Sequence, residues 1–177
     1  MSEQKRLFIA INIPDELKEK ISQTFLQKIK NQELSIVKKQ NLHITLKFLS
    51  YLDEKNTQEV KEKMQKIEFE EFKAPLKEIG EFNARVLWIG AHDTGEQMQK
   101  IVQQLNELLQ TTDEKFHPHI TLARNKHMSK IEFKKLVTEL NELNFSESFL
   151  VKSIDLMESK ISDSGAEYFK IFEKTQK

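Results

Sequence analysis

The tetrapeptide His-Ile-Thr-Leu occurs twice in the chain, beginning once at His43 and once at His119. Both copies lie in strand-like runs of apolar residues, and side chains two positions apart on a strand point to the same face. Each copy therefore places an imidazole beside a hydroxyl, that of Thr45 or of Thr121. Two histidines can hold one neutral base and one charged acid near neutral pH, and hydroxyls can donate hydrogen bonds to phosphate oxygens. This combination suits acid–base cleavage of a phosphodiester.

Histidines in such strands can also be structural or bind a metal. A single His-x-Thr sequence in a strand is more often a packed or exposed histidine than a catalytic one, but core packing gives no reason for the repetition. A metal site is the second alternative, because His117 and His119 flank a proline and could chelate. Neither copy carries an Asp or Glu in register as a further ligand. We therefore expect no metal and no other cofactor.

The composition is that of a polar protein without a membrane segment. Hydrophobic residues make up 38% of the chain, and no apolar run approaches the roughly 18 residues that predict a membrane span. The chain has no cysteine, which excludes disulfides, thiol nucleophiles and thiolate metal sites. Its first residues lack the pattern of a signal peptide. We expect a cytoplasmic protein.

The charges of the chain balance, with 28 Lys and Arg residues against 28 Asp and Glu residues. Proteins that bind long nucleic acids usually carry a basic stripe, whereas here lysines alternate with glutamates along the expected helices. We therefore expect no long nucleic-acid track, although a small basic site is compatible with this balance. The expected partner is a terminus or a small nucleotide, and the expected state is a monomer.

The chain repeats one order of elements: strand, helix, His-Thr strand, helix, strand. No linker separates the two copies of this order. We expect an α+β fold in a single domain, 1–177, with two interleaved lobes that correspond approximately to the halves 1–82 and 83–177. Each lobe is predicted to be an antiparallel sheet with helices outside. A pseudo-two-fold axis would relate the lobes, and the His-Thr strands would face a central cleft.

Local patterns predict several individual elements. A spacing of four predicts the buried stripe of a helix that follows Pro14, formed by Leu17, Ile21, Phe25 and Ile29. The sequence from Ser129 to Glu132 predicts a capped helix over 129–143. Further expectations are a helix over 94–110, an extended stretch over 69–82 broken by Pro75, and single strands over 149–158 and 167–172.

The residues around both motifs resemble the 2H phosphoesterase superfamily, and within it the 2′-5′ RNA ligase (LigT) branch of RNA 2′,3′-cyclic phosphodiesterases. The resemblance rests on Asn-Leu-His-Ile-Thr-Leu from Asn41 and on Pro-His-Ile-Thr-Leu-Ala-Arg from Pro118. It extends to Arg-Leu-Phe-Ile-Ala-Ile from Arg6 and to Arg-Val-Leu-Trp-Ile-Gly from Arg85. These segments span the chain from residue 6 to about residue 124.

The resemblance implies a bilobal fold and the metal-independent hydrolysis of a 2′,3′-cyclic phosphate to a 2′-phosphate. On the family pattern, His119 activates water and His43 protonates the departing 3′ oxygen, although the pseudo-symmetry makes these roles exchangeable from sequence. Thr45 and Thr121 would hold the phosphate, and Arg124 would contact the phosphate or the sugar. The reverse reaction would join RNA ends through a 2′-5′ linkage. The implied partners are RNA termini or small cyclic-phosphate nucleotides.

Two site candidates depend on how regular the strands are. Strict alternation places Arg124 on the face opposite His119, so Arg124 reaches the site only if the strand twists, bulges or ends there. Phe48 could stack on a base, but alternation assigns Phe48 to the core and Lys47 to the face of His43.

A noncatalytic function is the rival hypothesis. A binder of RNA termini or phosphorylated nucleotides would use the same cleft and would show tight binding without turnover. Binding alone gives little reason for two matched imidazoles.

Overall fold

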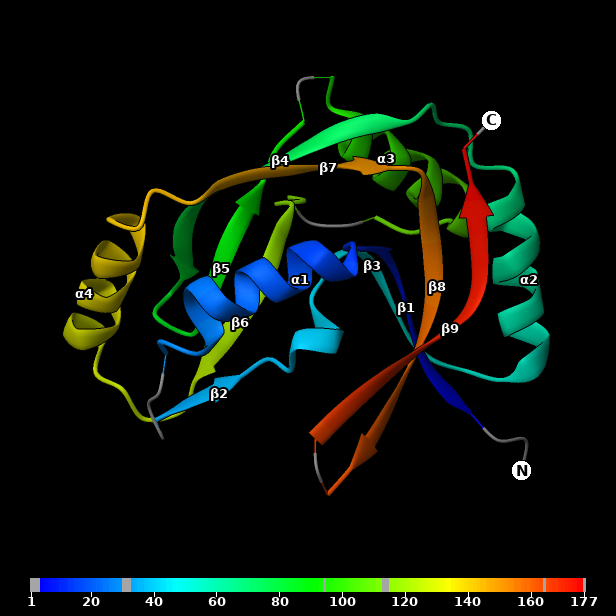
Figure 1. The fold of residues 1–177 in the computed structure, drawn as a ribbon. Coiled ribbons are helices and arrows are strands. Elements are labelled where there is room, and N and C mark those ends of the chain that lie inside the picture. The colour runs from blue at the N-terminus through cyan, green and yellow to red at the C-terminus, as the bar shows by residue number, and fades with distance from the viewer. Residues whose placement is uncertain (1–3, 30–32, 94, 113–114, 164, 177) are drawn as a thin grey trace.

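The computed structural model of the chain describes residues 4–29, 33–93, 95–112, 115–163 and 165–176. These residues form nine β-strands and four α-helices (Figure 1). The strands are β1 (Lys5–Asn12), β2 (Leu34–Ile36), β3 (His43–Leu52), β4 (Phe72–Phe82), β5 (Val86–Ala91), β6 (His119–Asn125), β7 (Ser146–Val151), β8 (Ser153–Ser162) and β9 (Gly165–Thr175). The helices are α1 (Asp15–Ile21), α2 (Glu54–Gln65), α3 (Gln97–Leu109) and α4 (Lys130–Asn141). A π-helical turn, η1 (Ser22–Leu26), continues α1, and a 3₁₀ turn, η2 (Lys39–Asn41), precedes β3.

The strands form one curled antiparallel sheet in the order β7-β4-β5-β6-β3-β1-β8-β9, with β2 paired to β6 (Figure 1). The two His-Thr strands, β3 and β6, meet in the middle of this sheet through one residue pair, Ile44 with Ile120. They join two halves of the sheet, β7-β4-β5-β6 and β3-β1-β8-β9. The predicted α+β class is confirmed.

All four helices pack with the sheet in a single hydrophobic core. The predicted stripe of the first helix is confirmed, because none of its four residues, Leu17, Ile21, Phe25 and Ile29, is more than 7% exposed. The predicted cap of α4 is also confirmed: Ser129 and Glu132 form a reciprocal capping box. The helix expected over 94–110 begins at Gln97, and Thr94 lies outside the described residues. No helix in the described ranges is long and apolar enough to cross a membrane.

The prediction of a single strand over 149–158 was wrong. β7 ends at Val151 and β8 begins at Ser153. β7 pairs with β4, whereas β8 pairs with β1, so the chain crosses from one half of the sheet to the other within two residues. The apolar run continues through this crossing because both strands contribute to the core, and periodicity alone therefore conceals the change of partner.

Pro75 lies inside β4 and does not break the strand, in contrast to the prediction. Its carbonyl oxygen accepts a hydrogen bond from the backbone N–H of His92 at 2.8 Å, just beyond the end of β5 at Ala91. The N–H and C=O groups of one residue face the same neighbour in an antiparallel pair. The missing N–H of Pro75 therefore faces the end of β5, where it costs the sheet little.

Both His-Thr strands contain a β-bulge directly after the threonine. The pairing of β3 with β1 shifts register between Thr45 and Lys47, and the pairing of β6 with β5 shifts between Thr121 and Ala123. Two consecutive residues are buried at each bulge, Leu46 with Lys47 and Leu122 with Ala123. A bulge inserts one extra residue, so the alternation of side chains is shifted beyond it.

The bulges determine where three side chains point. Phe48 is 71% exposed and lies on the face of the histidines, so the assignment of Phe48 to the core by alternation was wrong. Lys47 points to the opposite face, where its Nζ donates a hydrogen bond to Asn106 Oδ1 of α3 at 2.6 Å. Arg124 lies beyond the bulge in β6 and lines the same groove as the histidines. The sequence predicted that Arg124 could reach the site only through such an irregularity of the strand.

Candidate active site

A groove of about 1180 Å³ lies on the face of β3 and β6 that carries the histidines and threonines. All six residues selected from the sequence contribute to its lining: His43, Thr45, Phe48, His119, Thr121 and Arg124. Side chains of β1, β4, β8 and β9 form the remaining walls, among them Phe8, Phe82, Ser159 and Tyr168. The structure thus brings the six candidates together and takes lining residues from both halves of the sheet.

The pairing of Ile44 with Ile120 gives the groove a local two-fold symmetry. In an antiparallel register, the residue before one member of a pair lies across from the residue after the other. His43 is therefore opposite Thr121, and Thr45 is opposite His119. This register places both imidazoles and both hydroxyls on the same face of the two strands.

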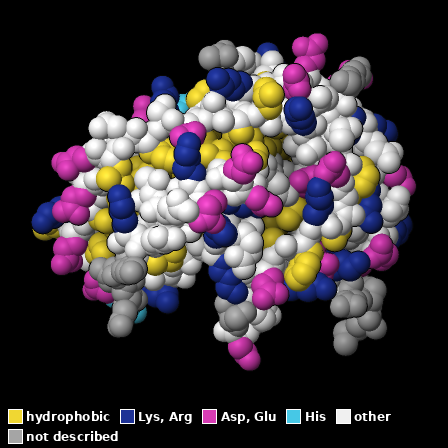
Figure 2. All heavy atoms as spheres, in the orientation of Figure 1, with side chains coloured by type: hydrophobic (Ala, Val, Ile, Leu, Met, Phe, Trp, Pro, Cys, Tyr) yellow, Lys and Arg dark blue, Asp and Glu magenta, His cyan; other side chains and the backbone are white. Residues whose placement is uncertain are grey.

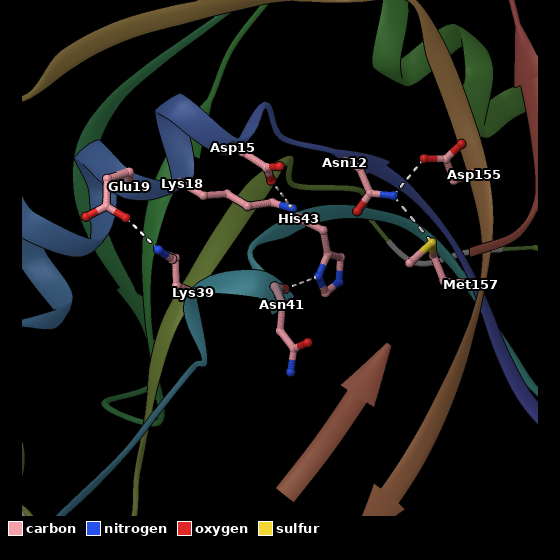
Figure 3. Close-up of polar contacts among 9 residues, drawn as sticks. All are labelled: Asn12, Asp15, Lys18, Glu19, Lys39, Asn41, His43, Asp155 and Met157. Carbon is pink, nitrogen blue, oxygen red and sulfur yellow. Dashed lines mark hydrogen bonds and ion pairs between the residues drawn. The ribbon is translucent and has the colours of Figure 1, made fainter. Parts of the chain in front are cut away.

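His43 begins β3 and is oriented by the turn before it. Its Nδ1 lies 2.6 Å from the carbonyl oxygen of Asn41 (Figure 3). A carbonyl only accepts, so Nδ1 carries the proton and Nε2 holds the lone pair in the neutral ring. This Nε2 lies 2.9 Å from Thr45 Oγ1. The ring packs against Phe8 and Tyr168, with centroid distances of 5.0 and 5.3 Å.

His119 begins β6 and is held in the same way. Its Nδ1 lies 2.7 Å from the carbonyl oxygen of His117, again two residues earlier. Its ring packs edge-on against Phe82 at a centroid distance of 5.0 Å, while Trp88 packs against His117 at 4.8 Å. In the described ranges, no side chain or backbone group forms a hydrogen bond with His119 Nε2. This lone pair is therefore open to the groove.

Burial lowers the pKa of both imidazoles. The pKa of His43 falls to about 4, because burial and the positive charges of His119 and Lys18 outweigh the hydrogen bond to the backbone carbonyl. Burial, followed by His117 and Arg124, lowers the pKa of His119 below its usual value. Both rings are therefore neutral at pH 7 in the free protein. A bound phosphate anion would favour the imidazolium form and raise both pKa values.

The groove differs in charge from the rest of the surface. Figure 2 shows basic and acidic side chains intermixed over the face in view, in keeping with the balanced composition. By contrast, the described residues that line the groove include Arg6 and Arg124 but no Asp or Glu. These two residues therefore supply positive charge to the groove without a competing carboxylate in its described lining.

Several groove residues were not selected from the sequence. Arg6, Phe82 and Tyr168 contribute to the lining, and Asn41 donates from Nδ2 to the carbonyl oxygen of Ala166 at 2.7 Å. This hydrogen bond ties the β8–β9 hairpin to the turn that orients His43. The sequence offered one signal for Arg6 and Tyr168, the rarity of their residue types, because the chain has only two tyrosines and three arginines.

A metal site at His117 and His119, the alternative left open by the sequence, lacks a third ligand among the described residues. His117 and His119 have ring centroids 6.1 Å apart with planes at 61°. Within the part of the chain that the structure describes, no three His, Cys, Asp or Glu side chains converge as metal ligands. The groove offers imidazole, hydroxyl and guanidinium groups instead.

Comparisons with known proteins agree with this geometry. A sequence model of the 2′-5′ RNA ligase superfamily matches residues 14–161. The chain belongs to this superfamily. The resemblance to 2H phosphoesterases that the two motifs indicated is thereby confirmed.

The relatives within the superfamily are similar over nearly their full length. A protein of Methanocaldococcus jannaschii named RNA 2′,3′-cyclic phosphodiesterase is 34% identical over 170 residues, which cover 92% of this chain and 96% of that protein. An Escherichia coli protein of the same name is 28% identical over 71% of this chain and 74% of its own length. The crystal structure of E. coli LigT in its apo form has a TM-score of 0.81 at 22% identity and covers 99% of both chains. A crystal structure of E. coli LigT complexed with 3′-AMP has a TM-score of 0.80, at 22% identity over 98% of this chain and 99% of that one. The fold is thus that of LigT.

Proposed function

We propose that this protein hydrolyses RNA or nucleotide 2′,3′-cyclic phosphates to 2′-phosphates by metal-independent acid–base catalysis. The observation that carries the proposal is the pair of imidazoles placed symmetrically about the Ile44–Ile120 pair, each with Nε2 directed by a bonded Nδ1. The names of the relatives support the same reaction. Because both halves of the sheet line the groove, we also propose that residues 1–177 act as one domain.

In the proposed mechanism, His119 is the base and His43 is the acid. The unoccupied Nε2 of His119 accepts a proton from water as the water oxygen attacks phosphorus. The bond from phosphorus to the 3′ oxygen breaks, and His43 Nε2–H supplies the proton for that oxygen. Each such proton transfer typically contributes about 10²–10⁴ in rate. The products are a 2′-phosphate and a free 3′-hydroxyl.

Three side chains are proposed to bind the phosphate. Thr45 and Thr121 donate hydrogen bonds to its non-bridging oxygens, where negative charge develops in the transition state. Arg124 supplies a guanidinium group, which suits paired hydrogen bonds to phosphate oxygens. The hydroxyl of Thr45 contacts His43 Nε2 in the free protein, so substrate binding would turn this hydroxyl toward the phosphate.

The same groups support a second reaction, the transesterification of the cyclic phosphate by an alcohol. A 5′-hydroxyl in the place of water would lose its proton and attack the cyclic phosphate, and the released 3′ oxygen would regain one. The product is a 2′-5′ linkage. The description of the superfamily as 2′-5′ RNA ligases supports this reaction, and we propose it as a secondary activity.

A synthetic RNA oligonucleotide that ends in a 2′,3′-cyclic phosphate tests the proposed function. We expect the protein to add one water molecule to this end, at a rate that EDTA does not change. Mass spectrometry of the oligonucleotide measures the conversion. Tight binding of the RNA without conversion would contradict the proposal and would support the rival binding function.

We expect the pH profile of kcat/KM to be bell-shaped, with its maximum below about pH 6.5. In the active form of the free enzyme, one imidazole is neutral and the other is protonated to imidazolium. The population with a single imidazolium is greatest midway between the two pKa values. Both values are lowered by burial, so this midpoint lies below the ordinary histidine pKa. Steady-state rates between pH 4 and pH 9 measure the profile. A maximum above pH 7 would contradict the assignment.

The profile of kcat is expected to lie at higher pH than that of kcat/KM. The bound phosphodiester carries a negative charge, which stabilises the imidazolium form and raises the pKa values in the complex. Coincident profiles would indicate that the imidazoles do not contact the phosphate.

A further inference from the structure

Only certain residue types line the groove. The groove contains both tyrosines of the chain, Tyr51 and Tyr168, and two of its three arginines, Arg6 and Arg124. Its described lining contains no Lys, Asp or Glu, although these three types are common in the chain. Arginine binds phosphate through a planar fork of donors, and aromatic rings stack on bases. The lining is therefore suited to nucleotides over its whole length.

The two arginines lie at separate places in the groove. Arg124 is on β6 close to His119, whereas Arg6 is on β1, where its register partner on β3 is Tyr51. Tyr51 lies eight residues beyond His43 on β3, but two bulges shorten this span. The partners of these residues on β1, Arg6 and Asn12, are six residues apart, which corresponds to roughly 20 Å along the strand. Arg6 is thus too far from the histidines to contact the phosphate that is cleaved.

The guanidinium group of Arg6 is available for a ligand. Arg6 is exposed, and it forms no ion pair or hydrogen bond with any part of the chain that the structure describes. Its neighbour Lys5 differs, because Lys5 Nζ lies 2.8 Å from Glu54 Oε2. The position that faces the groove therefore keeps its positive charge free, while the adjacent position is paired.

Aromatic side chains connect the histidines with Arg6. The Phe8 ring lies 5.0 Å from the His43 ring and 6.4 Å from the Phe48 ring. Beyond them, Phe48 is 71% exposed and Tyr51 is 57% exposed. The bulge after Thr45 turns Phe48 into the groove instead of into the core. Exposed rings beside a free guanidinium group are the features of sites that bind single-stranded nucleic acid.

We propose that Arg6, Phe48 and Tyr51 form a distal site that binds the nucleotide preceding the cyclic-phosphate end. Arg6 contacts the phosphate that links this nucleotide to the terminal one, and the rings of Phe48 and Tyr51 stack on its base. The preferred substrate is then an RNA oligonucleotide and not a cyclic mononucleotide. This inference rests on the proposed function and specifies its substrate class.

A series of substrates of increasing length tests the distal site. The substrates are adenosine 2′,3′-cyclic phosphate, the same compound with a 5′-phosphate, and the dinucleotide ApA with a 2′,3′-cyclic phosphate. We expect kcat/KM for the dinucleotide to exceed that for the mononucleotide by at least about tenfold, because base stacking is added. The 5′-phosphorylated mononucleotide is expected to lie between them.

Variants assign the effect to the distal site. Arg6→Gln should reduce the ratio of dinucleotide to mononucleotide kcat/KM several-fold, and Arg6→Lys should restore part of it. The salt dependence of dinucleotide kcat/KM should become shallower in Arg6→Gln by roughly one phosphate contact. Lys5→Gln removes a charge from the adjacent, paired position and should leave the ratio unchanged.

The outcomes separate this inference from the proposed function. Hydrolysis of all three substrates at equal kcat/KM would overturn the distal site alone. Equal acceleration by the 5′-phosphate and by the preceding nucleotide would also overturn it, since no base would then be bound. Hydrolysis of none of the substrates would overturn the proposed function and the distal site together.

Discussion

His43→Ala and His119→Ala are each expected to lower kcat/KM for a 2′,3′-cyclic phosphate by at least about a hundredfold. Each substitution removes one of two proton transfers that occur in the same step. The double variant should lose little more than either single variant, because groups that act as a unit are not additive. His127→Ala, which removes an exposed histidine outside the groove, should retain full activity. Steady-state rates of the four variants measure these effects, and full activity in either single variant would contradict the mechanism.

A substrate with a better leaving group distinguishes the two roles. A p-nitrophenyl phosphodiester releases p-nitrophenolate, which needs no proton from the enzyme at neutral pH. With this substrate His43→Ala should lose much less activity than with a cyclic phosphate, whereas His119→Ala should lose as much. The opposite result would exchange the acid and the base while leaving the two-histidine mechanism in place.

Gly80→Ala is expected to lower both stability and activity, although Gly80 lies outside the groove lining. An added Cβ at Gly80 would lie 2.1–2.6 Å from three carbon atoms of the Trp88 indole, so the indole would have to move. The indole packs against Phe82 and against His117, whose carbonyl oxygen orients His119. We expect a loss of about 1–3 kcal/mol in the free energy of unfolding and a roughly ten- to hundredfold lower kcat. Denaturant unfolding and steady-state kinetics measure the two losses.

A matched substitution and a double variant control for this effect. At Gly95 an added Cβ contacts only the side chain of Gln97, at 3.2 Å or more, so Gly95→Ala should be nearly neutral. In a Trp88→Leu background, Gly80→Ala should cost little stability, because the smaller side chain leaves room for the methyl group. An equal cost in both backgrounds would show that the contact with Trp88 is not the cause.

The chemistry of the site could be predicted from sequence because it depends on local rules. Strand alternation is sufficient to place His43 with Thr45 and His119 with Thr121 on a common face, because each bulge comes only after the threonine. The helix stripe beginning at Leu17 follows equally from a spacing of four residues. These features need no knowledge of which strand pairs with which.

The features that could not be predicted depend on pairing between distant strands. The bulges after Thr45 and Thr121 exist because β3 and β6 each pair with a strand whose register shifts, and nothing in the local sequence marks the shift. Phe48 and Lys47 were exchanged between faces for this reason, while Arg124 needed the bulge to reach the groove. The division between β7 and β8 likewise appears only when their partners, β4 and β1, are known.

The net charge of the chain did not predict the local positive charge of the groove. A formal net charge of zero argued against a long basic track, and the surface in Figure 2 shows mixed charges. The sum does not report where charges lie, however, and the described lining of the groove carries two arginines without any carboxylate. Local charge at a site this small affects the net charge too little to be visible in composition.

Phosphorus NMR of the reaction product tests the two-histidine hydrolysis most directly. Adenosine 2′,3′-cyclic phosphate is incubated with the wild-type protein in ¹⁸O-enriched water, and the His43→Ala/His119→Ala variant is treated in parallel. We predict that the wild-type protein produces the 2′-phosphate, with one ¹⁸O bound to phosphorus, and that the double variant leaves the substrate unchanged on the same timescale. Formation of the 3′-phosphate, or equal turnover by the double variant, would contradict the proposed mechanism.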